Sequence, residues 1–445
     1  DTILKEHAPN KCAREYFEAI ESFYSKVINE NDGLIDAIVN NDMNIDDNEV
    51  KILADSISKN HQYSGEKQLF LDISVIVHGD AKSGIQRVVR SLLLEILKNP
   101  PKDFRVMAIY YDETHYRYAT SFIAKIFDKP FLDIGDEIVD FRQNDIYLAL
   151  DLNAHLTHAV HAFHKYLQCI GVKLYFIVYD ILLVQRPDWW HEGTSLLFEE
   201  WLKSITEVST SLICISEAVA NEVREWMDKN PPKRLSLPEV KSFHLGADVD
   251  NSLPSKGLPN NSESVLSRLI SKPSFLMVGT VEPRKGHKQT LEAFEKLWQD
   301  ELDIVLVIIG KEGWLVDDLV KKLRNHPQLN KQLFWLEGIS DEYLEKIYAS
   351  STCLIAASKG EGFGLPLIEA AQHKIPIIAR DIPVFREVAG KYAYYFENNK
   401  DSNVITDAVK NWLKLYKQNN HPKSDDMPWL TWEESTKQLL NCLKI

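Results

Sequence analysis

The stretch SKGEGFGLPLIEAAQHKIPIIAR, residues 358–380, carries the strongest fold signal in the chain. It follows an apolar run at 352–357, opens on a glycine-rich loop at 360–364 and continues into a helical pattern with Pro366 in the first turn. A strand, a glycine loop and a helix in direct succession are typical of a parallel α/β sheet. The glycines let backbone N–H groups approach a ligand at the positive end of the helix. The stretch therefore predicts a phosphate site.

Two glutamates stand eight positions apart within this stretch. Glu361 lies in the loop, and Glu369 lies in the second turn of an otherwise apolar helix. A carboxylate on a buried helix face is costly unless it accepts hydrogen bonds, and sugar hydroxyls donate such bonds. The alternative is that Glu361 caps the helix and backbone groups satisfy Glu369. The spacing favours the sugar-binding interpretation without excluding the alternative.

A second stretch, VGTVEPRKGHKQTLEAF at 278–294, places two adjacent cations after a strand. The strand ends at Gly279, and Arg284 and Lys285 occupy the turn before the next helix. Because the carboxyl ends of parallel strands meet at one sheet edge, these cations should face the same cleft as the 360–364 loop. There they would neutralise a departing diphosphate. An isolated basic pair is ordinarily a solvated turn, and only its place on this edge favours binding.

Strand-like and helix-like runs alternate on both sides of a linker-like segment rich in Pro, Gly, Ser and Asn at 251–264. The apolar strand-like runs lie at 68–77, 104–111, 145–150, 173–180, 211–216, 274–279, 303–310, 333–338, 352–357 and 375–380. This pattern predicts an α/β chain with two Rossmann-like, doubly wound parallel sheets facing a cleft. The expected segments are a helical N-terminal extension at 1–66, an N-terminal domain at 67–255, a C-terminal domain at 256–428 and a closing helix at 429–445.

The composition fits two soluble domains. The chain has 445 residues, of which 44% are hydrophobic and 26% charged, and its net charge of -14 argues against a nucleic-acid-binding surface. Its five scattered cysteines form no CxxC pair, which favours reduced thiols in the cytoplasm. Without an apolar run near 18 residues, at most a peripheral contact with the inner face of a membrane is expected. The sequence opens at Asp1 without a methionine, which is compatible with part of a larger polypeptide.

Taken in order, several motifs resemble the family-4 retaining glycosyltransferases. They are VGTVEPRKGH at 278–287, LEGISDEYLEKIYASSTCLIAAS at 336–358 and EGFGLPLIEAA at 361–371. The similarity covers about residues 68–443, and PWLTWEESTKQLL at 428–440 resembles the helix that crosses back to the N-terminal domain. The resemblance implies the GT-B fold, a nucleotide-sugar donor and no metal or other cofactor.

The resemblance also implies roles for the glycine loop and its helix. Glu369 would hold the ribose hydroxyls of the nucleotide, and Glu361 would contact hydroxyls of the transferred sugar. The backbone N–H groups of Phe363, Gly364 and Leu365 would meet sugar and phosphate.

Further roles follow from the same resemblance. Arg284 and Lys285 would hold the diphosphate, and Gly338 lies where the family packs its base against backbone. Gly84, in a loop before the first helix, would let the N-terminal domain approach the phosphates. A helical stripe of histidines in LNAHLTHAVHAFHKYL at 152–167 has spacing compatible with metal, but a solvated or packed face is the favoured interpretation.

Two positions depart from the family pattern. Many members carry an arginine where this chain has Thr280, which leaves the donor-site charge to Arg284 and Lys285. Many members carry a histidine at the end of the strand where this chain has Tyr179 and Asp180. Asp180 would then bind the transferred sugar or the acceptor, and Tyr179 is either its neighbour or a core aromatic.

The expected activity is transfer of a hexose with retention of configuration. The motifs are most similar to bacterial mannosyltransferases of O-antigen and polysaccharide synthesis, so GDP-mannose is the first expected donor and a UDP-hexose its rival. The acceptor would be a glycan or a lipid-linked saccharide, with association with other enzymes left open. Two other readings remain at this point: a phosphorylase or epimerase on the same fold, and a non-catalytic domain that binds nucleotide or glycan.

Overall fold

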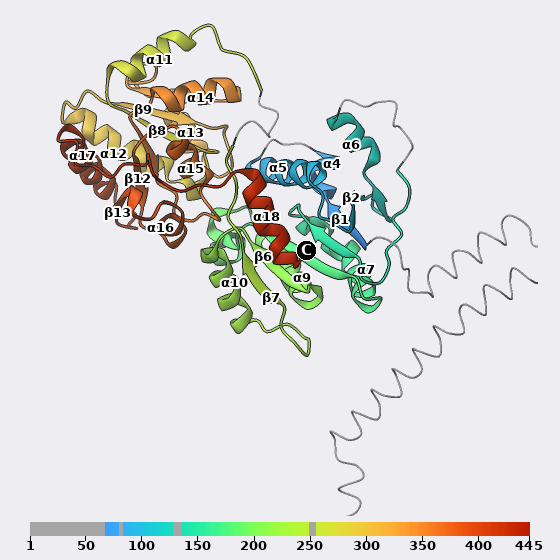
Figure 1. Cartoon of the computed structure of the whole chain (residues 1–445). Coiled ribbons are helices and arrows are strands. Elements are labelled where there is room, and N and C mark those ends of the chain that lie inside the picture. The colour runs from blue at the N-terminus through green and yellow to red at the C-terminus, as the bar shows by residue number, and fades with distance from the viewer. Residues whose placement is uncertain (1–66, 80–82, 128–135, 249–254) are drawn as a thin grey trace, which may run out of the picture. The chain divides into compact units, whose positions relative to one another are not determined.

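The computed structural model describes residues 67–79, 83–127, 136–248 and 255–445. The predicted extension at 1–66 lies outside this part, as do residues 251–254 of the predicted linker. The described residues contain two β-sheets with helices on both faces (Figure 1). None of their helices is both long and apolar enough to cross a bilayer.

The first sheet has seven strands in the order β3-β2-β1-β4-β5-β6-β7, and every neighbouring pair except β2 and β3 is parallel. The strands are β1 (Lys67–Asp72), β2 (Phe104–Tyr111), β3 (Tyr116–Tyr118), β4 (Ile146–Ala149), β5 (Lys173–Val178), β6 (Ser211–Cys214) and β7 (Glu239–Ser242). The helices are α4 (Ser74–His78), α5 (Gly84–Lys98), α6 (Thr120–Ile126), α7 (Thr157–Cys169), α8 (Leu182–Gln185), α9 (Thr194–Val208) and α10 (Glu217–Lys229), with short 3-10 turns η2 (Ala154–Leu156) and η3 (Pro187–Trp189).

The second sheet has six parallel strands in the order β10-β9-β8-β11-β12-β13. They are β8 (Ser274–Val278), β9 (Val305–Ile309), β10 (Leu333–Leu336), β11 (Cys353–Ala356), β12 (Ile377–Arg380) and β13 (Ala393–Phe396). The helices are α11 (Ser262–Ser271), α12 (His287–Gln299), α13 (Asp317–Arg324), α14 (Asp341–Ser350), α15 (Leu365–Gln372), α16 (Pro383–Ala389), α17 (Asn403–Lys417) and α18 (Trp432–Leu443), with 3-10 turns η5 (Pro283–Lys285) and η6 (Gly390–Tyr392). The predicted pair of doubly wound sheets is confirmed.

The strand order of the second sheet fixes where a ligand can bind. The chain runs outward from β8 in one direction through β9 and β10, and then in the other direction through β11, β12 and β13. The order therefore reverses between β8 and β11, which are hydrogen-bonded neighbours. The loops that leave such a pair diverge to opposite faces of the sheet, and the crevice between them is the usual ligand site of an open α/β sheet.

Alternation along the strands builds a core on each face. In β1, Leu69 and Leu71 pack on the side of α5, whereas Phe70 packs on the opposite side. All three side chains are completely buried. The cluster on the α5 side continues through Leu276 of β8 and Leu367 of α15, so a single apolar core is shared by the two sheets.

The first strand is shorter than predicted. The sequence suggests an apolar strand over 68–77, but β1 ends at Asp72 and α4 follows at once. The buried Asp72 carboxylate accepts hydrogen bonds from the Ser74 backbone N–H at 2.9 Å and from the Ser74 hydroxyl at 2.5 Å. This local turn competes with the sheet ladder, and an apolar pattern alone does not reveal it.

The closing helix α18 lies against α5 of the first sheet (Figure 1). Lys241 donates to the Cys442 carbonyl at 2.7 Å, and Ser435 donates to the His244 carbonyl at 2.7 Å. Gly246 permits this approach, because a Cβ at its position would lie 2.6 Å from the Trp432 Cα atom.

We expect Gly246→Ala to push α18 away from the first sheet and to lower the free energy of unfolding by about 1–3 kcal/mol, a typical cost of overpacking. Chemical denaturation measures this change. Gly79→Ala is the matched control, since a Cβ there meets no heavy atom within 4 Å and its φ of -171° is open to any residue. Equal stability of the two variants would contradict the proposed close packing.

Candidate functional site

The two sequence stretches singled out above meet at the reversal point between β8 and β11. The turn after β8 carries Arg284 and Lys285 in η5, and the loop after β11 carries Ser358 and Glu361. The Lys359 backbone N–H donates to the Arg284 carbonyl at 2.7 Å, which ties the two loops together. The geometric expectation that both stretches converge on one pocket therefore holds.

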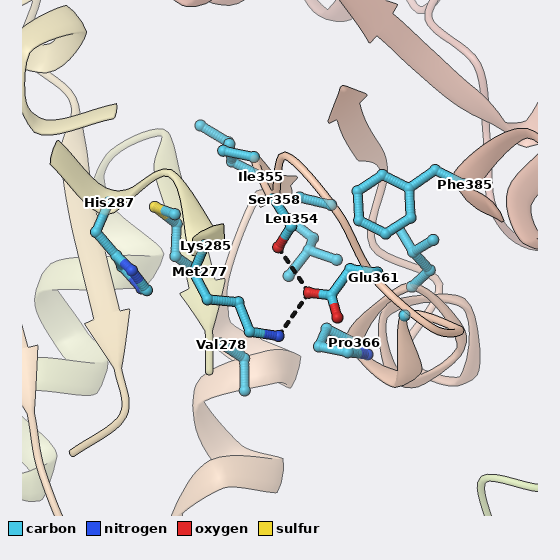
Figure 2. Close-up of a pocket in the computed structure, with 14 residues that line it drawn as sticks. Met277, Val278, Lys285, His287, Leu354, Ile355, Ser358, Glu361, Pro366 and Phe385 are labelled. Atoms are coloured by element: carbon cyan, nitrogen blue, oxygen red, sulfur yellow. Dashed lines mark hydrogen bonds and ion pairs between the residues drawn. The ribbon is translucent and has the colours of Figure 1, made fainter. Parts of the chain in front are cut away.

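Glu361 forms the centre of a cluster with Arg284, Lys285 and Ser358, which we call the Glu361 cluster. Lys285 Nζ lies 2.5 Å from Glu361 Oε1, and the Ser358 hydroxyl donates to the same oxygen at 2.7 Å (Figure 2). Arg284 Nη1 donates to Glu361 Oε2 at 2.9 Å. Only 11% of the Glu361 side chain is exposed, so all of these charge-assisted contacts act in a largely water-excluded site.

The cluster fixes the protonation state of Glu361. Burial alone would raise the pKa of this carboxyl, but Lys285 and Arg284 outweigh burial and lower the pKa to about 2. Glu361 is therefore ionised at neutral pH and acts as an acceptor of hydrogen bonds. A group with so low a pKa is a poor general acid or base near pH 7.

Arg284 is surrounded by carboxylates. Its Nη1 also donates to the Gly360 carbonyl at 3.2 Å, and its Nε lies 2.7 Å from Glu282 Oε1. That second contact is an ion pair, because its geometry does not satisfy a hydrogen bond. Burial would lower the pKa of Arg284, yet Glu361, Glu282 and Asp180 raise it on balance. The guanidinium thus stays charged.

Asp180 belongs to the same neighbourhood. Burial raises its pKa and the nearby charge of Arg284 opposes that rise, while Glu361 and Lys285 also act on it. One of its oxygens accepts the Leu182 backbone N–H at 3.1 Å. Tyr179 is a core residue whose hydroxyl donates to the Leu150 carbonyl at 2.7 Å. Of Tyr179 and Asp180, Asp180 is the residue that interacts electrostatically with the Glu361 cluster, whereas Tyr179 is the core aromatic.

The glycine loop is held against the first sheet. A Cβ at Gly362 would lie 1.9 Å from the Tyr179 carbonyl oxygen, so only glycine fits there. The Ser216 hydroxyl donates to the Gly362 carbonyl at 2.7 Å. Phe363, 3% exposed, sets its ring edge-on to His244 at 5.3 Å between centroids. These contacts position the loop that carries Glu361 relative to β5 and β6.

Glu369 obtains its hydrogen bonds from the chain itself. Arg87 of α5 lies 2.6 Å from Oε1, and the Tyr348 hydroxyl donates to Oε2 at 2.5 Å. Side chains, and not the backbone groups of the alternative, therefore satisfy Glu369 in the protein, while the expected bonds from ribose hydroxyls stay a prediction. Arg87 was not identified from the sequence, because its partner lies 282 positions away. The only local signal is its place in the first turn of the helix that begins at Gly84.

The other predicted binding residues differ in burial and in whether they belong to the Glu361 cluster. Gly364, with φ 98°, caps the start of α15, and Leu365 is the first helical residue. Thr280 is half-buried at the end of β8. Gly84 is the exposed first residue of α5 and does not lie in a loop before that helix, as the sequence suggested, whereas Gly338 lies in an exposed bend after β10; neither belongs to the Glu361 cluster.

The histidine stripe is packed at His164, whereas His155 and His158 are exposed. Burial lowers the pKa of His164 to about 3, and its Nε2 lies 3.0 Å from the Tyr116 hydroxyl. His158 pairs with Glu200 at 3.0 Å. Within the described ranges, no three or more His, Cys, Asp or Glu side chains gather as they would around a metal ion.

Comparison with known families and sequences gives a consistent result. Residues 267–425 match the family model described as glycosyl transferases group 1. The chain is 48% identical over 396 residues to the serotype-specific mannosyltransferase WbdA of Escherichia coli, which covers 88% of this chain and 48% of that protein. It is also 25% identical to the O-antigen chain mannosyltransferase B of Escherichia coli, over 38% of this chain and 45% of that protein. The chain thus spans about half the length of these curated relatives.

Solved structures share the fold at low sequence identity. Anabaena Alr3699/HepE in complex with UDP and glucose has a TM-score of 0.58 at 13% identity, covering 85% of this chain and 99% of that one. The sucrose-phosphate synthase of Thermosynechococcus elongatus has a TM-score of 0.58 at 15% identity, covering 85% of this chain and 98% of that one. The expected GT-B fold is confirmed.

The Glu361 cluster makes a pH-dependent contribution to stability. The pKa of Glu361 is lowered from 4.5 to about 2 on folding, so the ionised carboxylate stabilises the fold above pH 4.5 and this contribution is lost as the pH falls towards 2. We expect Glu361→Gln to lower the free energy of unfolding at neutral pH by roughly 3–5 kcal/mol, because it removes the carboxylate that pairs with Lys285 and leaves Arg284 with Glu282 alone.

Urea unfolding of wild type and variant at about pH 7 and about pH 3 measures this effect. The difference in the free energy of unfolding between the two proteins should be smaller at the lower pH. Glu225→Gln, which changes an exposed carboxylate, is the control and should show little change at either pH. A gap for Glu361→Gln that is the same at both pH values would rule out an ionised, stabilising Glu361.

Proposed function

We propose that this chain transfers mannose from GDP-mannose to a saccharide acceptor with retention of configuration. Residues 267–425 match the family model described as glycosyl transferases group 1, and the chain has the GT-B fold. The observation that carries the proposal is the Glu361 cluster. It brings two cations to the reversal point of the second sheet, where an α/β sheet of this kind binds its ligand.

The chemistry depends on stabilising a leaving group. As the glycosidic bond to the nucleotide breaks, the anomeric carbon becomes cationic and the diphosphate gains negative charge. Arg284, Lys285 and the N-terminus of α15 at Gly364 would take up that charge without reorganisation. Glu361, held ionised, would accept hydrogen bonds from hydroxyls of the sugar. A phosphate oxygen would take the proton of the acceptor hydroxyl, since Glu361 is too weak a base for that role.

Glu369 has capacity left for the nucleotide. An ionised carboxylate offers about four lone-pair positions, and Arg87 and Tyr348 each use one. The ribose hydroxyls of a nucleotide would fill the others. On this account Arg87 stays beside Glu369 and brings positive charge from the first sheet towards the phosphates.

The sugar and the acceptor are proposed from the relatives. A relative at 48% identity is named a serotype-specific mannosyltransferase, and two more distant relatives, at 25% and 28% identity, are named O-antigen chain mannosyltransferases. Mannose is accordingly the proposed sugar, and a glycan or lipid-linked saccharide the proposed acceptor. We propose further that transfer needs no metal ion, because Arg284 and Lys285 supply the charge that a cation would otherwise provide.

Removal of the cations tests the mechanism. We expect Arg284→Gln and Lys285→Gln each to slow mannose transfer about a hundredfold or more, corresponding to about 3 kcal/mol of lost transition-state stabilisation. Lys288→Gln, an exposed position in the next turn, should transfer at the wild-type rate. Transfer from radiolabelled GDP-mannose, measured with and without EDTA, gives the readout. Wild-type rates in both site variants, or loss of wild-type transfer in EDTA, would refute the mechanism.

A thermal-shift screen tests the donor. At a hundred times its dissociation constant, a bound nucleotide sugar should stabilise the fold by about 2.7 kcal/mol. We expect GDP-mannose and GDP to raise the melting temperature and UDP-glucose to leave it unchanged at equal concentration. If UDP-glucose alone raises the melting temperature, the donor is a UDP-sugar and not GDP-mannose. If none of these ligands raises it, the result argues against a nucleotide-sugar site.

A further inference from the structure

A second cavity opens beside Glu361, and it is distinct from the pocket in Figure 2. Its volume is about 250 Å3. Its wall comes from α8, η3 and α10 of the first sheet and from the loops that follow β11, β12 and β13 of the second. Drug-sized ligands occupy sites of roughly 300–1,000 Å3, so this cavity suits one sugar ring. We call it the Glu222 cavity.

The wall of the Glu222 cavity mixes hydrogen-bonding and apolar groups. Besides Arg186 and Glu361, the hydrogen-bonding side chains are two amides, a carboxyl and an ammonium group: Gln185, Asn398, Glu222 and Lys359. Leu182 and Trp189 add apolar surface. Sugar rings present hydroxyls that both donate and accept, together with C–H faces that pack on apolar side chains. The lining therefore has the two kinds of surface that a sugar needs.

The charge balance of the cavity favours a neutral ligand. Arg186 is neutralised by Asp188, with Nε and Nη2 at 2.9 and 2.7 Å from its two carboxylate oxygens, and its guanidinium stacks on Trp189 at 4.1 Å. Glu361 is neutralised by its own two cations. Lys359 and Glu222 remain, and they have opposite signs.

Glu222 has an unused acceptor. Its Oε2 atom is buried and has no hydrogen-bond partner among the described residues. Burial raises the pKa of Glu222 to about 7, and the neighbouring Asp180 adds to the rise. A buried acceptor without a partner is costly, and a donated hydroxyl would remove that cost. The electrostatic effect of Asp180 on Glu222 shows that the two carboxyl groups are neighbours, and Asp180 in turn interacts with the Glu361 cluster.

We propose that the Glu222 cavity binds one neutral sugar ring of the acceptor glycan, with Glu222 accepting a hydrogen bond from a ring hydroxyl. The ring would lie next to Glu361 and Asp180, and so beside the sugar that is transferred. This place in the reaction rests on the proposed glycosyltransferase function, whereas binding of the ring does not.

Two measurements on the full chain test the inference. The first uses saturation-transfer NMR to detect the binding of methyl α-D-mannopyranoside in the absence of donor. The second is the KM for a mannose-terminated acceptor, beside the KM for GDP-mannose. We expect Glu222→Ala to abolish the NMR signal and to raise the acceptor KM about tenfold or more, with the donor KM unchanged. Glu225→Ala, an exposed position on the same helix, is the matched control.

The outcomes separate the cavity from the proposed function. If Glu222→Ala unfolds, Gln185→Ala replaces it, because Gln185 is an exposed residue of the same wall. We expect Gln185→Ala to weaken the NMR signal and to raise the acceptor KM, both by less than Glu222→Ala would, with the donor KM unchanged. No glycoside binding to wild type, equal binding by wild type and both variants, or an effect on the donor KM alone would overturn the inference. If the protein binds the glycoside through Glu222 but transfers no mannose, the proposed sugar site stands and the proposed activity is refuted.

Discussion

The rest of the site depends on the buried ion pairs of Glu361 with Arg284 and Lys285. Their geometry follows from the sheet, because β8 and β11 are neighbours and their loops must emerge side by side. A buried carboxylate would be expensive alone, and two buried cations would repel each other. Together they hold two loops, more than 70 positions apart in the chain, in one place. The arrangement is a preorganised charge site: its cations are fixed before any ligand arrives, and its carboxylate cannot take up a proton near neutral pH.

Contacts between the two domains hold the Glu361 cluster in a fixed position relative to the first sheet. Gly362 meets the end of β5, and Ser216 binds the same loop from the start of α10. Arg87 reaches Glu369, and Trp190 stacks on Trp314 with 5.0 Å between centroids. Each contact joins a residue of the first sheet to one of the second. Groups from both sheets therefore surround Glu361: the donor side is formed by the loops of β8 and β11, and the proposed acceptor side adds α8 and α10.

The sequence was sufficient for the fold and for the centre of the site because both rest on local signals. Apolar strands alternating with amphipathic helices gave the two sheets, and the order of a doubly wound sheet brought the 284–285 turn to the 360–364 loop. What could not be predicted depends on distant partners. Arg87 and Tyr348 are ordinary helix residues until the fold brings them to Glu369, and the free oxygen of Glu222 follows from packing. The early end of β1 was missed since Asp72 and Ser74 act through a side-chain turn that an apolar pattern hides.

A crystal structure of the chain with GDP tests the central claim most directly. The account predicts that the diphosphate lies between the η5 turn and the start of α15, with its terminal phosphate within hydrogen-bonding distance of Arg284 or Lys285 and the ribose hydroxyls on Glu369. GDP bound elsewhere, or a diphosphate that leaves both cations paired only with Glu361 and Glu282, would contradict it.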